Sequence, residues 1–334
     1  METDNSPLPL DTVNTMDSEV VAKLPLGTKP LKICAHGDSL WTCTARLDAE
    51  LDGVEQIYFL KTSFGERGEK MMSSEFHCMM KIHNIMPDFV PRPIAWGTYA
   101  SIPNVHFFLC EFRDMTNGLP DVESFSEKVA DMHLAGISPN GKFGFDVTTF
   151  HGNIPIEHGW SDTWEEYFTR TTRVLFELEQ KAQGPNEEIM GLMGPFFGKI
   201  IPRLLRPLET SGRSIQPCLI HGDLWHGNVS VDKHTGRPVI FDAACFYAHN
   251  EYELGVWRQS WNKIDKKYRI RYYDRFPKSQ PEGDYDDRNA LYATRVNLLD
   301  SILYKGETCY REMLIENMRG LIKKFPQGLE GFEG

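Results

Sequence analysis

The stretch Leu219-Ile-His-Gly-Asp-Leu-Trp-His-Gly-Asn228, followed by Pro238-Val-Ile-Phe-Asp242, carries the strongest structural signal in this chain. The apolar runs at 218–220 and 239–241 contain β-branched and aromatic residues, which predicts two short buried strands. Each run leads into an Asp, and the two glycines of the first stretch let its backbone turn tightly. Polar side chains that follow two neighbouring strands can converge on one pocket, so we predict a functional site here.

Four residues separate Asp223 from Asn228, which is the spacing of the catalytic loop in protein kinases. In that loop the Asp accepts the proton of the attacking hydroxyl, and the Asn and a second Asp hold magnesium. Asp242, just after a strand, stands where the second Asp would stand. Asp and Asn between strands are more often turn formers. The neighbouring His-Gly and the strand-ending Asp nevertheless favour a phosphoryl-transfer site with ATP and Mg²⁺ as cofactors.

The segments His221-Gly-Asp-Leu-Trp-x-Gly-Asn228 and Val239-Ile-Phe-Asp-Ala-Ala-x-Phe-Tyr247 resemble the fructosamine/ketosamine 3-kinase family, relatives of the aminoglycoside phosphotransferases. The Trp within the loop and the following Ala248-His-Asn-Glu-Tyr-Glu-Leu-Gly255 separate that family from other small-molecule kinases. The resemblance runs from about Ile33 to the C-terminus. One departure is Ala243, where many members carry Pro after the metal-binding Asp.

The resemblance implies an α+β, protein-kinase-like fold with an antiparallel-sheet N-lobe and a mainly helical C-lobe. We place a mobile acidic segment at 1–22, the N-lobe at 23–112 and the C-lobe at 113–334. The implied activity is ATP-dependent phosphorylation of the O3 hydroxyl of ketosamines, the ribulosamine or fructosamine adducts of free amines or protein lysines, which promotes deglycation. On the substrate side, Trp225 offers a flat apolar face to a sugar ring and His221 supports the loop backbone.

The N-lobe prediction depends on three strands and the helix that follows them. Alternating or continuous apolar residues predict strands at 31–34, 41–47 and 56–61, and helical periodicity predicts a helix at 68–85. Lys61 closes the third strand, and Glu75 lies on the helix 14 residues later. A Lys on that strand paired with a Glu on the next helix holds the nucleotide phosphates in kinases. Glu69 is the second candidate for the acid.

Two further segments are candidates for nucleotide contacts. In the turn His36-Gly-Asp-Ser39, the backbone around Gly37 and the Ser39 hydroxyl are placed to contact phosphate oxygens. A plain hairpin turn is the alternative interpretation, since the turn holds only one Gly. Predicted strands at 94–97 and 105–112 lead into a hinge, where the backbone of Glu111, Phe112 and Arg113 would read the adenine edge.

The C-lobe is predicted to be mainly helical. Helices are expected at 124–137, with a Ser124–Glu127 capping box, and at 162–183, 189–210, 288–304 and 307–325. Another helix is expected to start near Asn250, and a charged, Pro-containing surface excursion is expected at 268–287. In the Gly- and aromatic-rich loop at 141–158, His151 and His158 are expected to pack the loop rather than to line a sugar pocket.

The amino-acid composition limits the kinds of molecule that this protein is expected to bind. The 334 residues contain 36 Lys and Arg against 47 Asp and Glu, a net charge of −11, which argues against nucleic acid or an anionic membrane as partner. Seven Cys without a C-x-x-C pair indicate reduced thiols, and the start of the chain resembles no secretory signal, so we expect a cytoplasmic protein. Oxidation at Cys34 or Cys43 could link two chains, so a monomer or a redox-linked dimer is expected.

Alternatives remain open at this point. The chain could be a kinase for another small alcohol, such as an aminoglycoside or choline, although Trp225 speaks against that. It could also be a nucleotide-binding pseudokinase, although both Asp223 and Asn228 are present. The choice between ribulosamine and fructosamine, and between free and protein-bound adducts, is not decided by these residues.

Overall fold

The computed structural model describes residues 14–37 and 39–332, and divides the chain into two compact units. Unit 1 comprises Met1–Asn117 and Val231–Ala244, and unit 2 comprises Gly118–Ser230 and Cys245–Gly334. The predicted lobe boundary follows residue 112, whereas unit 1 continues to Asn117 and also takes in the later segment that ends just after Asp242. A contiguous lobe prediction misses this because the chain returns to unit 1 more than 100 residues after leaving it.

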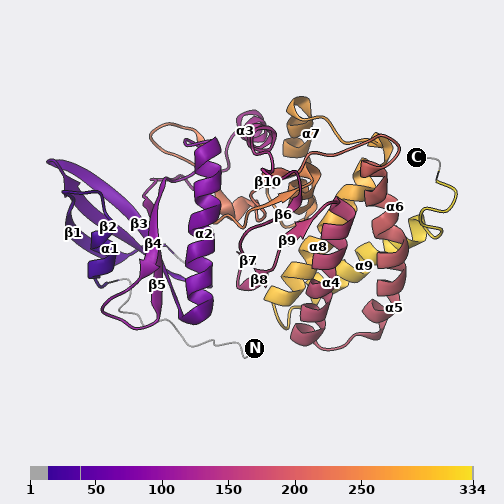
Figure 1. The fold of residues 1–334 in the computed structure, drawn as a ribbon, viewed down its shortest axis with the longest axis horizontal. Helices are drawn as coiled ribbons and strands as arrows, with labels where there is room; N and C mark the ends of the chain where they lie inside the picture. The colour runs from indigo at the N-terminus through magenta and orange to yellow at the C-terminus, as the bar shows by residue number, and fades with distance from the viewer. Residues whose placement is uncertain (1–13, 38, 333–334) are drawn as a thin grey trace. The chain divides into compact units, whose positions relative to one another are not determined.

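Unit 1 is built on one antiparallel sheet, visible at the indigo end of the chain in Figure 1. Its strand order is β1-β2-β3-β5-β4, with bounds β1 (Lys29–Ala35), β2 (Cys43–Leu51), β3 (Val54–Phe64), β4 (Pro93–Thr98) and β5 (Val105–Glu111). Lys61 lies near the end of β3, between Thr44 of β2 and Phe108 of β5. The predicted antiparallel N-lobe sheet is confirmed.

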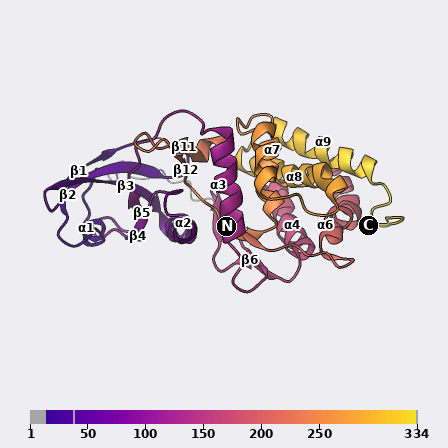
Figure 2. The ribbon, with the colours of Figure 1, turned by 90° about the horizontal axis from the view of Figure 1, so that it is seen from above.

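The helix α2 (Gly65–Ile85) follows β3 directly and packs against β3, β4 and β5, as Figures 1 and 2 show. The junction is tight, because a Cβ on Gly68 would lie 2.7 Å from the carbonyl carbon of Ser63. An apolar core of the sheet includes Leu47, Leu60 and Phe107, all fully buried, and is completed by Val20 and Leu24 rather than by α2.

The short helix α1 (Ser18–Ala22) lies within the segment expected to be mobile, but its start is well packed. Asp17 caps the helix by accepting the N–H of Glu19, and its carboxylate also accepts the N–H groups of Ala100 and Ser101. Asp17 is 1% exposed. The chain is therefore anchored from Asp17 onward, in contrast to the expectation of mobility up to residue 22; residues 1–13 lie outside the described part.

Unit 2 is mainly helical, as predicted. Its α-helices are α3 (Val122–Ala135), α4 (Trp164–Gln183), α5 (Glu187–Pro195), α6 (Ile201–Leu205), α7 (Lys266–Arg275), α8 (Tyr285–Leu303) and α9 (Thr308–Lys324). Shorter turns are the π-helix η2 (Phe196–Ile200) and the 3-10 helices η3 (Arg206–Glu209), η4 (His226–Asn228), η5 (Asn250–Arg258) and η6 (Glu282–Asp284). Helix α8 packs on both α4 and α9 (Figure 2).

A small sheet in unit 2 brings distant segments together. Its order is β10 (Cys218–Ile220), β13 (Phe246–Ala248), β6 (Phe143–Phe145) and β9 (Gly159–Ser161), and β7 (Thr149–His151) pairs with β8 (Ile154–Ile156). The remaining short strands are β11 (Val229–Val231) and β12 (Pro238–Ile240). Because β10 and β13 are antiparallel neighbours, the loop that follows β10 lies beside the start of η5.

Three helix predictions differ from the structure. Helix α3 is capped by Asp121, which accepts the N–H groups of Glu123 and Ser124, so Ser124 lies inside the helix and forms no capping box. The segment predicted as one helix at 189–210 is helical without a gap, but it changes type from α5 to the π-helix η2, then α6 and the 3-10 helix η3, near its prolines. The predicted surface excursion contains α7, which packs on α3 through the buried Tyr268 and Tyr272.

No helix in the described ranges is long and apolar enough to cross a membrane. The seven cysteines all carry free thiols, and Cys34 and Cys43 are half-buried. They do not lie opposite each other, because Cys34 pairs across the sheet with Arg46 and Cys43 with Thr62.

Candidate active site

In unit 1, one buried lysine joins residues far apart in the sequence. Lys61 Nζ lies 2.8 and 2.9 Å from the two carboxylate oxygens of Glu75 and 2.7 Å from Oδ1 of Asp242. Lys61 is 6% exposed. Glu75, rather than Glu69, is therefore the acid that meets the lysine. The structure thus brings together three of the predicted site residues.

The charges of this cluster are unbalanced. Burial alone lowers the pKa of Lys61, but the carboxylates of Asp242 and Glu75 raise it above its usual value, so the ammonium stays charged. Burial raises the pKa of Glu75 to about 7, with Lys61 opposing and Asp242 adding to the rise. Two acids share one cation, and the Asp242 side chain is 46% exposed.

Asp242 also has an unusual backbone. Its φ is +59°, in the left-handed region that side chains other than Gly seldom adopt. A residue held in such a conformation costs on the order of 1–3 kcal/mol and persists only where its surroundings fix it. The preceding strand is anchored by the N–H of Ile240, which donates to the carbonyl of Phe89. The strained backbone aims the carboxylate at Lys61.

In unit 2, the loop after β10 holds Asp223 through Asn228. The Asn228 amide nitrogen donates to the backbone carbonyl of Asp223 at 2.9 Å and to its carboxylate at 3.1 Å. Asn228 is 6% exposed, whereas Asp223 is partly exposed. Because the amide nitrogen faces Asp223, the amide oxygen is left as an acceptor. The arrangement fixes one carboxylate oxygen of Asp223 and leaves the side chain accessible from solvent.

The buried carboxylate of Glu253, on η5, holds the start of this loop. It accepts the N–H of His221 at 2.5 Å and the N–H of Gly222 at 3.0 Å, and is 2% exposed. Gly222 has φ +84°, which suits Gly and few other residues. Glu253 is a direct support of the loop backbone.

His221 supports the loop from inside. Its ring is fully buried, and its Nδ1 accepts the backbone N–H of Asp223 at 3.3 Å. This hydrogen bond to the loop backbone gives His221 a supporting role. Two further side chains hold the loop, since the Trp257 indole donates to the carbonyl of Leu224 and Asn262 accepts the N–H of His226.

Replacing Glu253 with Gln tests this support. The amide keeps the shape but turns an N–H₂ group toward a backbone N–H, so one buried donor loses its acceptor. We expect a loss of about 1–3 kcal/mol in the free energy of unfolding, together with a lower kcat. Urea unfolding and an ADP-release assay measure the two effects.

Glu209→Gln is the matched control, because the Glu209 carboxylate also accepts a backbone N–H, that of Trp164, at 2.8 Å. The control should lose stability without losing kcat. Equal kcat values for wild type and Glu253→Gln would show that the Glu253 contact does not position the loop.

Trp225 is held by its own loop. A Cβ on Gly227 would lie 2.2 Å from the indole ring, so only Gly allows this packing. The rings of His226 and Trp261 contact the indole edge-on, with centroids at 4.9 and 6.0 Å. The indole is partly exposed. Trp261 was not singled out in the sequence, because no motif marks it.

His151 is better placed than the sequence suggested. Its Nδ1 lies 3.5 Å from Oδ1 of Asp223, and its side chain is 12% exposed. His158 does pack the loop as expected, since it is buried between the hydroxyls of Thr149 and Tyr167. Burial lowers the pKa of His158 to about 3, so it stays neutral. The packing prediction therefore holds for His158, and His151 instead faces the predicted base.

The turn predicted to contact the nucleotide phosphates is held by hydrogen bonds within the turn itself. Gly37 has φ +80°, and the Ser39 hydroxyl oxygen accepts the N–H groups of Trp41 and Thr42 and the Thr42 hydroxyl. The Ser39 hydroxyl therefore stabilises the turn itself. Asp38 lies outside the described residues.

In the predicted hinge, two of the backbone N–H groups are already used in hydrogen bonds to other backbone carbonyls. The N–H of Glu111 donates to the carbonyl of Arg92, and that of Phe112 donates to the carbonyl of Ile57. The Arg113 guanidinium pairs with Glu111 at 3.0 Å and with Asp232 at 3.3 Å. Within this segment, adenine recognition would thus fall to carbonyl groups and to the backbone of Arg113.

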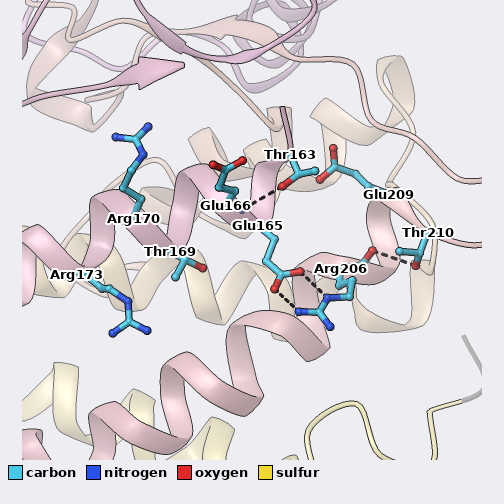
Figure 3. A pocket seen from close by; sticks show the side chains of 9 residues that line it. All are labelled: Thr163, Glu165, Glu166, Thr169, Arg170, Arg173, Arg206, Glu209 and Thr210. Carbon is cyan, nitrogen blue, oxygen red and sulfur yellow. Dashed lines mark hydrogen bonds and ion pairs between the residues drawn. The ribbon is translucent and has the colours of Figure 1, made fainter. Parts of the chain in front are cut away.

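A pocket of about 660 Å³ opens at the N-terminus of α4, away from these residues in the sequence (Figure 3). The Glu165 carboxylate and the Arg206 guanidinium form a two-pronged ion pair within it, at 2.9 and 2.7 Å. Its lining residues are Thr163, Glu165, Glu166, Thr169, Arg170, Arg173, Arg206, Glu209 and Thr210. None of the predicted site residues lines this pocket.

The sequence matches the family model "Fructosamine kinase" over residues 35–319. A rice (Oryza sativa subsp. japonica) protein-ribulosamine 3-kinase, chloroplastic, is 32% identical over 237 residues, covering 70% of this chain and 64% of that protein. The match thus spans less than two thirds of the rice protein. A mouse (Mus musculus) ketosamine-3-kinase is 27% identical over 297 residues, covering 82% of this chain and 90% of the mouse protein.

Two solved structures show the same fold. A protein assigned as a fructosamine-3-kinase from Thermobifida fusca has a TM-score of 0.70 at 20% identity, covering 93% of this chain and 99% of that one. The aminoglycoside phosphotransferase APH(4)-Ia, as a thermostable mutant in a ternary complex with AMP-PNP and hygromycin B, has a TM-score of 0.59 at 13% identity. That match covers 92% of this chain and 98% of the phosphotransferase.

Proposed function

The chain belongs to the fructosamine kinase family, and we propose that it transfers the γ-phosphoryl group of ATP to the O3 hydroxyl of a ketosamine. The observation that carries this is the buried Lys61, which Glu75 and Asp242 share. A Lys–Glu pair of this kind must be in place for phosphate binding in kinases. The names of the rice and mouse relatives support the ketosamine as acceptor.

Asp223 is the proposed base. Its carboxylate, oriented by the Asn228 amide, would accept a hydrogen bond from the O3 hydroxyl and take its proton as the phosphoryl group is transferred. Trp225 would pack against the sugar ring, since its indole is fixed by Gly227 and partly exposed. His221 would act through the loop backbone and not on the substrate.

Lys61 would bind the α- and β-phosphates, and Glu75 would hold the Lys61 side chain in place. The backbone of Arg113 and the hinge carbonyl groups would contact the adenine. The AMP-PNP complex of the related fold supports ATP as the donor. The Asn228 amide oxygen and the Asp242 carboxylate would hold Mg²⁺, since both are the hard oxygen ligands that this ion prefers, and it usually takes only one or two protein carboxylates beside phosphates. When bound, the ion neutralises charge on the phosphates.

A coupled assay of ADP release tests the proposal. Wild-type protein with ATP and Mg²⁺ is expected to release ADP in the presence of a synthetic ribulosamine or fructosamine, because both carry the O3 hydroxyl. The ratio of kcat/KM for the two sugars names the preferred ketosamine. EDTA should abolish the release, because the phosphate charge is then not neutralised.

Hygromycin B and choline serve as controls for the alternative acceptors. ADP release with either control, and none with the two ketosamines, would overturn the proposal in favour of another small-alcohol kinase. ATP binding without release on any acceptor would point to a pseudokinase. Three expectations stay predictions: a cytoplasmic location, glycated proteins as substrates, and a dimer linked through Cys34 or Cys43.

A further inference from the structure

Helix α8 carries two buried polar side chains with hydrogen-bonding atoms that no described residue satisfies. Asn297 is fully buried, and within the described residues neither its amide oxygen nor its amide nitrogen has a partner. Asp300 is 6% exposed, and its Oδ2 likewise has no partner there. Residues three apart on a helix lie on the same face, so the two groups form one patch. Buried polar groups are nearly always satisfied, so this patch requires an explanation.

The Asp300 carboxyl lies within the electrostatic reach of the proposed base. Burial raises its pKa to about 8, and the negative charge of Asp223 adds to the rise. Burial raises the pKa values of Tyr304 and Tyr310, and the charge of Asp300 raises them further. The rings of these two tyrosines stack with their centroids 5.2 Å apart. All four residues belong to unit 2. Helix α8 also packs on η5, whose Glu253 holds the start of the catalytic loop, so the patch lies on a helix that adjoins the support of that loop.

Three other buried acids of unit 2 pair with an Arg side chain. Glu179 pairs with Arg311, Glu251 with Arg288 and Asp284 with Arg203. Asp300 differs, since none of the Lys, Arg or His side chains that the structure describes forms an ion pair with it. Burial and a neighbouring acid disfavour the charged form of a carboxyl, and a cation placed beside it favours that form. A cationic group is therefore the partner that would stabilise the Asp300 carboxylate.

We infer that Asp300, assisted by the amide oxygen of Asn297, binds the protonated amine of the ketosamine. This inference rests on the proposed function. In a ketosamine the amine nitrogen and O3 are separated by only three carbon atoms, so a group that binds the ammonium must lie close to the base. Asp300 meets this requirement because α8 packs on η5, the support of the Asp223 loop, and the charge of Asp223 acts on the Asp300 carboxyl.

The subsite would select for ketosamines against ordinary ketoses. A secondary ammonium ion donates hydrogen bonds to the Asp300 carboxylate and the Asn297 amide oxygen, and its charge offsets the repulsion between Asp300 and Asp223. A sugar without the amine leaves these buried groups unpaired. A site built to bind a polar group discriminates strongly against analogues that lack it.

Asp300→Asn tests the inference, with a ribulosamine and its N-acetylated analogue as the two substrates. Acetylation removes the positive charge and keeps the sugar and the O3 hydroxyl. For the charged ketosamine, the variant should lose about 10- to 100-fold in kcat/KM, mainly through KM, as expected for a lost hydrogen bond to a charged group. For the analogue, kcat/KM should stay within about twofold, because that substrate makes no ion pair to lose.

Asp287→Asn is the matched control, since Asp287 lies on the same helix and pairs with Lys324 at 2.6 Å. It should leave both KM values unchanged. Asn297→Ser, which keeps a small polar side chain, should weaken the charged ketosamine selectively and to a smaller extent. A patch satisfied only by water predicts instead that Asp300→Asn changes neither substrate, or both equally, and either result overturns the inference.

Calorimetric titration separates this inference from the proposed function. The dissociation constant of the ribulosamine should rise about tenfold or more in Asp300→Asn, whether or not wild-type protein releases ADP. Absent ADP release with wild-type protein counts against the kinase proposal alone. Unchanged ketosamine binding in Asp300→Asn counts against the amine subsite alone.

Discussion

Asp223→Asn is expected to lower kcat by about 10²- to 10⁴-fold, the usual contribution of a positioned general base. The Asn side chain has the same shape, and its amide oxygen can still accept the hydrogen bond from Asn228. The loop should therefore keep its geometry, while the group that takes the proton is lost. Single-turnover ADP release with a ketosamine measures the effect, and thermal unfolding verifies that the fold is retained.

Asp265→Asn is a suitable control for Asp223→Asn. Asp265 caps α7 by accepting the N–H of Lys267, a role that Asn fills about equally well. The control should have the wild-type kcat. If Asp223→Asn kept more than about a tenth of the wild-type kcat, positioning by the neighbouring groups would be sufficient, and Asp223 would not be the base.

Arg288→Met is expected to lower the free energy of unfolding by about 3–5 kcal/mol, because it leaves a buried charge without its partner. Arg288 and Glu251 are both fully buried and form a two-pronged pair at 2.9 and 3.1 Å. Arg288 also donates to the carbonyls of Ser279 and Pro281. Glu251 lies on η5, two residues before Glu253, so the loss should also loosen the catalytic loop. Urea unfolding and kcat report the two consequences.

The exposed pair between Arg258 and Asp286 provides the control for Arg288→Met. Arg258→Met removes an ion pair of 2.7 Å whose Asp is 71% exposed, and should cost less than about 1 kcal/mol. Replacing both buried partners, as Arg288→Met with Glu251→Leu, should recover much of the lost stability, because no unpaired charge remains. Equal losses for Arg288→Met and Arg258→Met would contradict the role of the buried pair.

The sequence alone was sufficient where the signal is local. The alternation of apolar residues identified the sheet of unit 1, and the 14-residue interval from Lys61 to Glu75 spans only one strand end and one helix. The spacing from Asp223 to Asn228 likewise describes a single loop, whose geometry follows from adjacent residues. These features depend on backbone periodicity and short separations, which a sequence displays directly.

Local signals failed where tertiary packing overrode them. Helix α7 is rich in charge and buries chiefly Tyr268 and Tyr272, so its amphipathic pattern is faint and the neighbouring prolines suggested irregular structure. A capping box at Ser124 was locally acceptable. The helix instead begins three residues earlier in the chain, near the start of unit 2, where Asp121 caps α3. In both cases the neighbouring elements selected one of several locally acceptable structures.

The sequence by itself determined the fold class, the family motifs and the chemistry available at Lys61, Asp223, Asn228 and Asp242. Only the tertiary structure decided which other groups support or surround that chemistry: Glu253 beneath the loop, His151 beside the base, and Asp300 buried without a cation. The physical reason is that these contacts join backbone donors or like charges over long separations. Neither a backbone N–H nor an unpaired carboxylate has a spacing rule that a sequence could reveal.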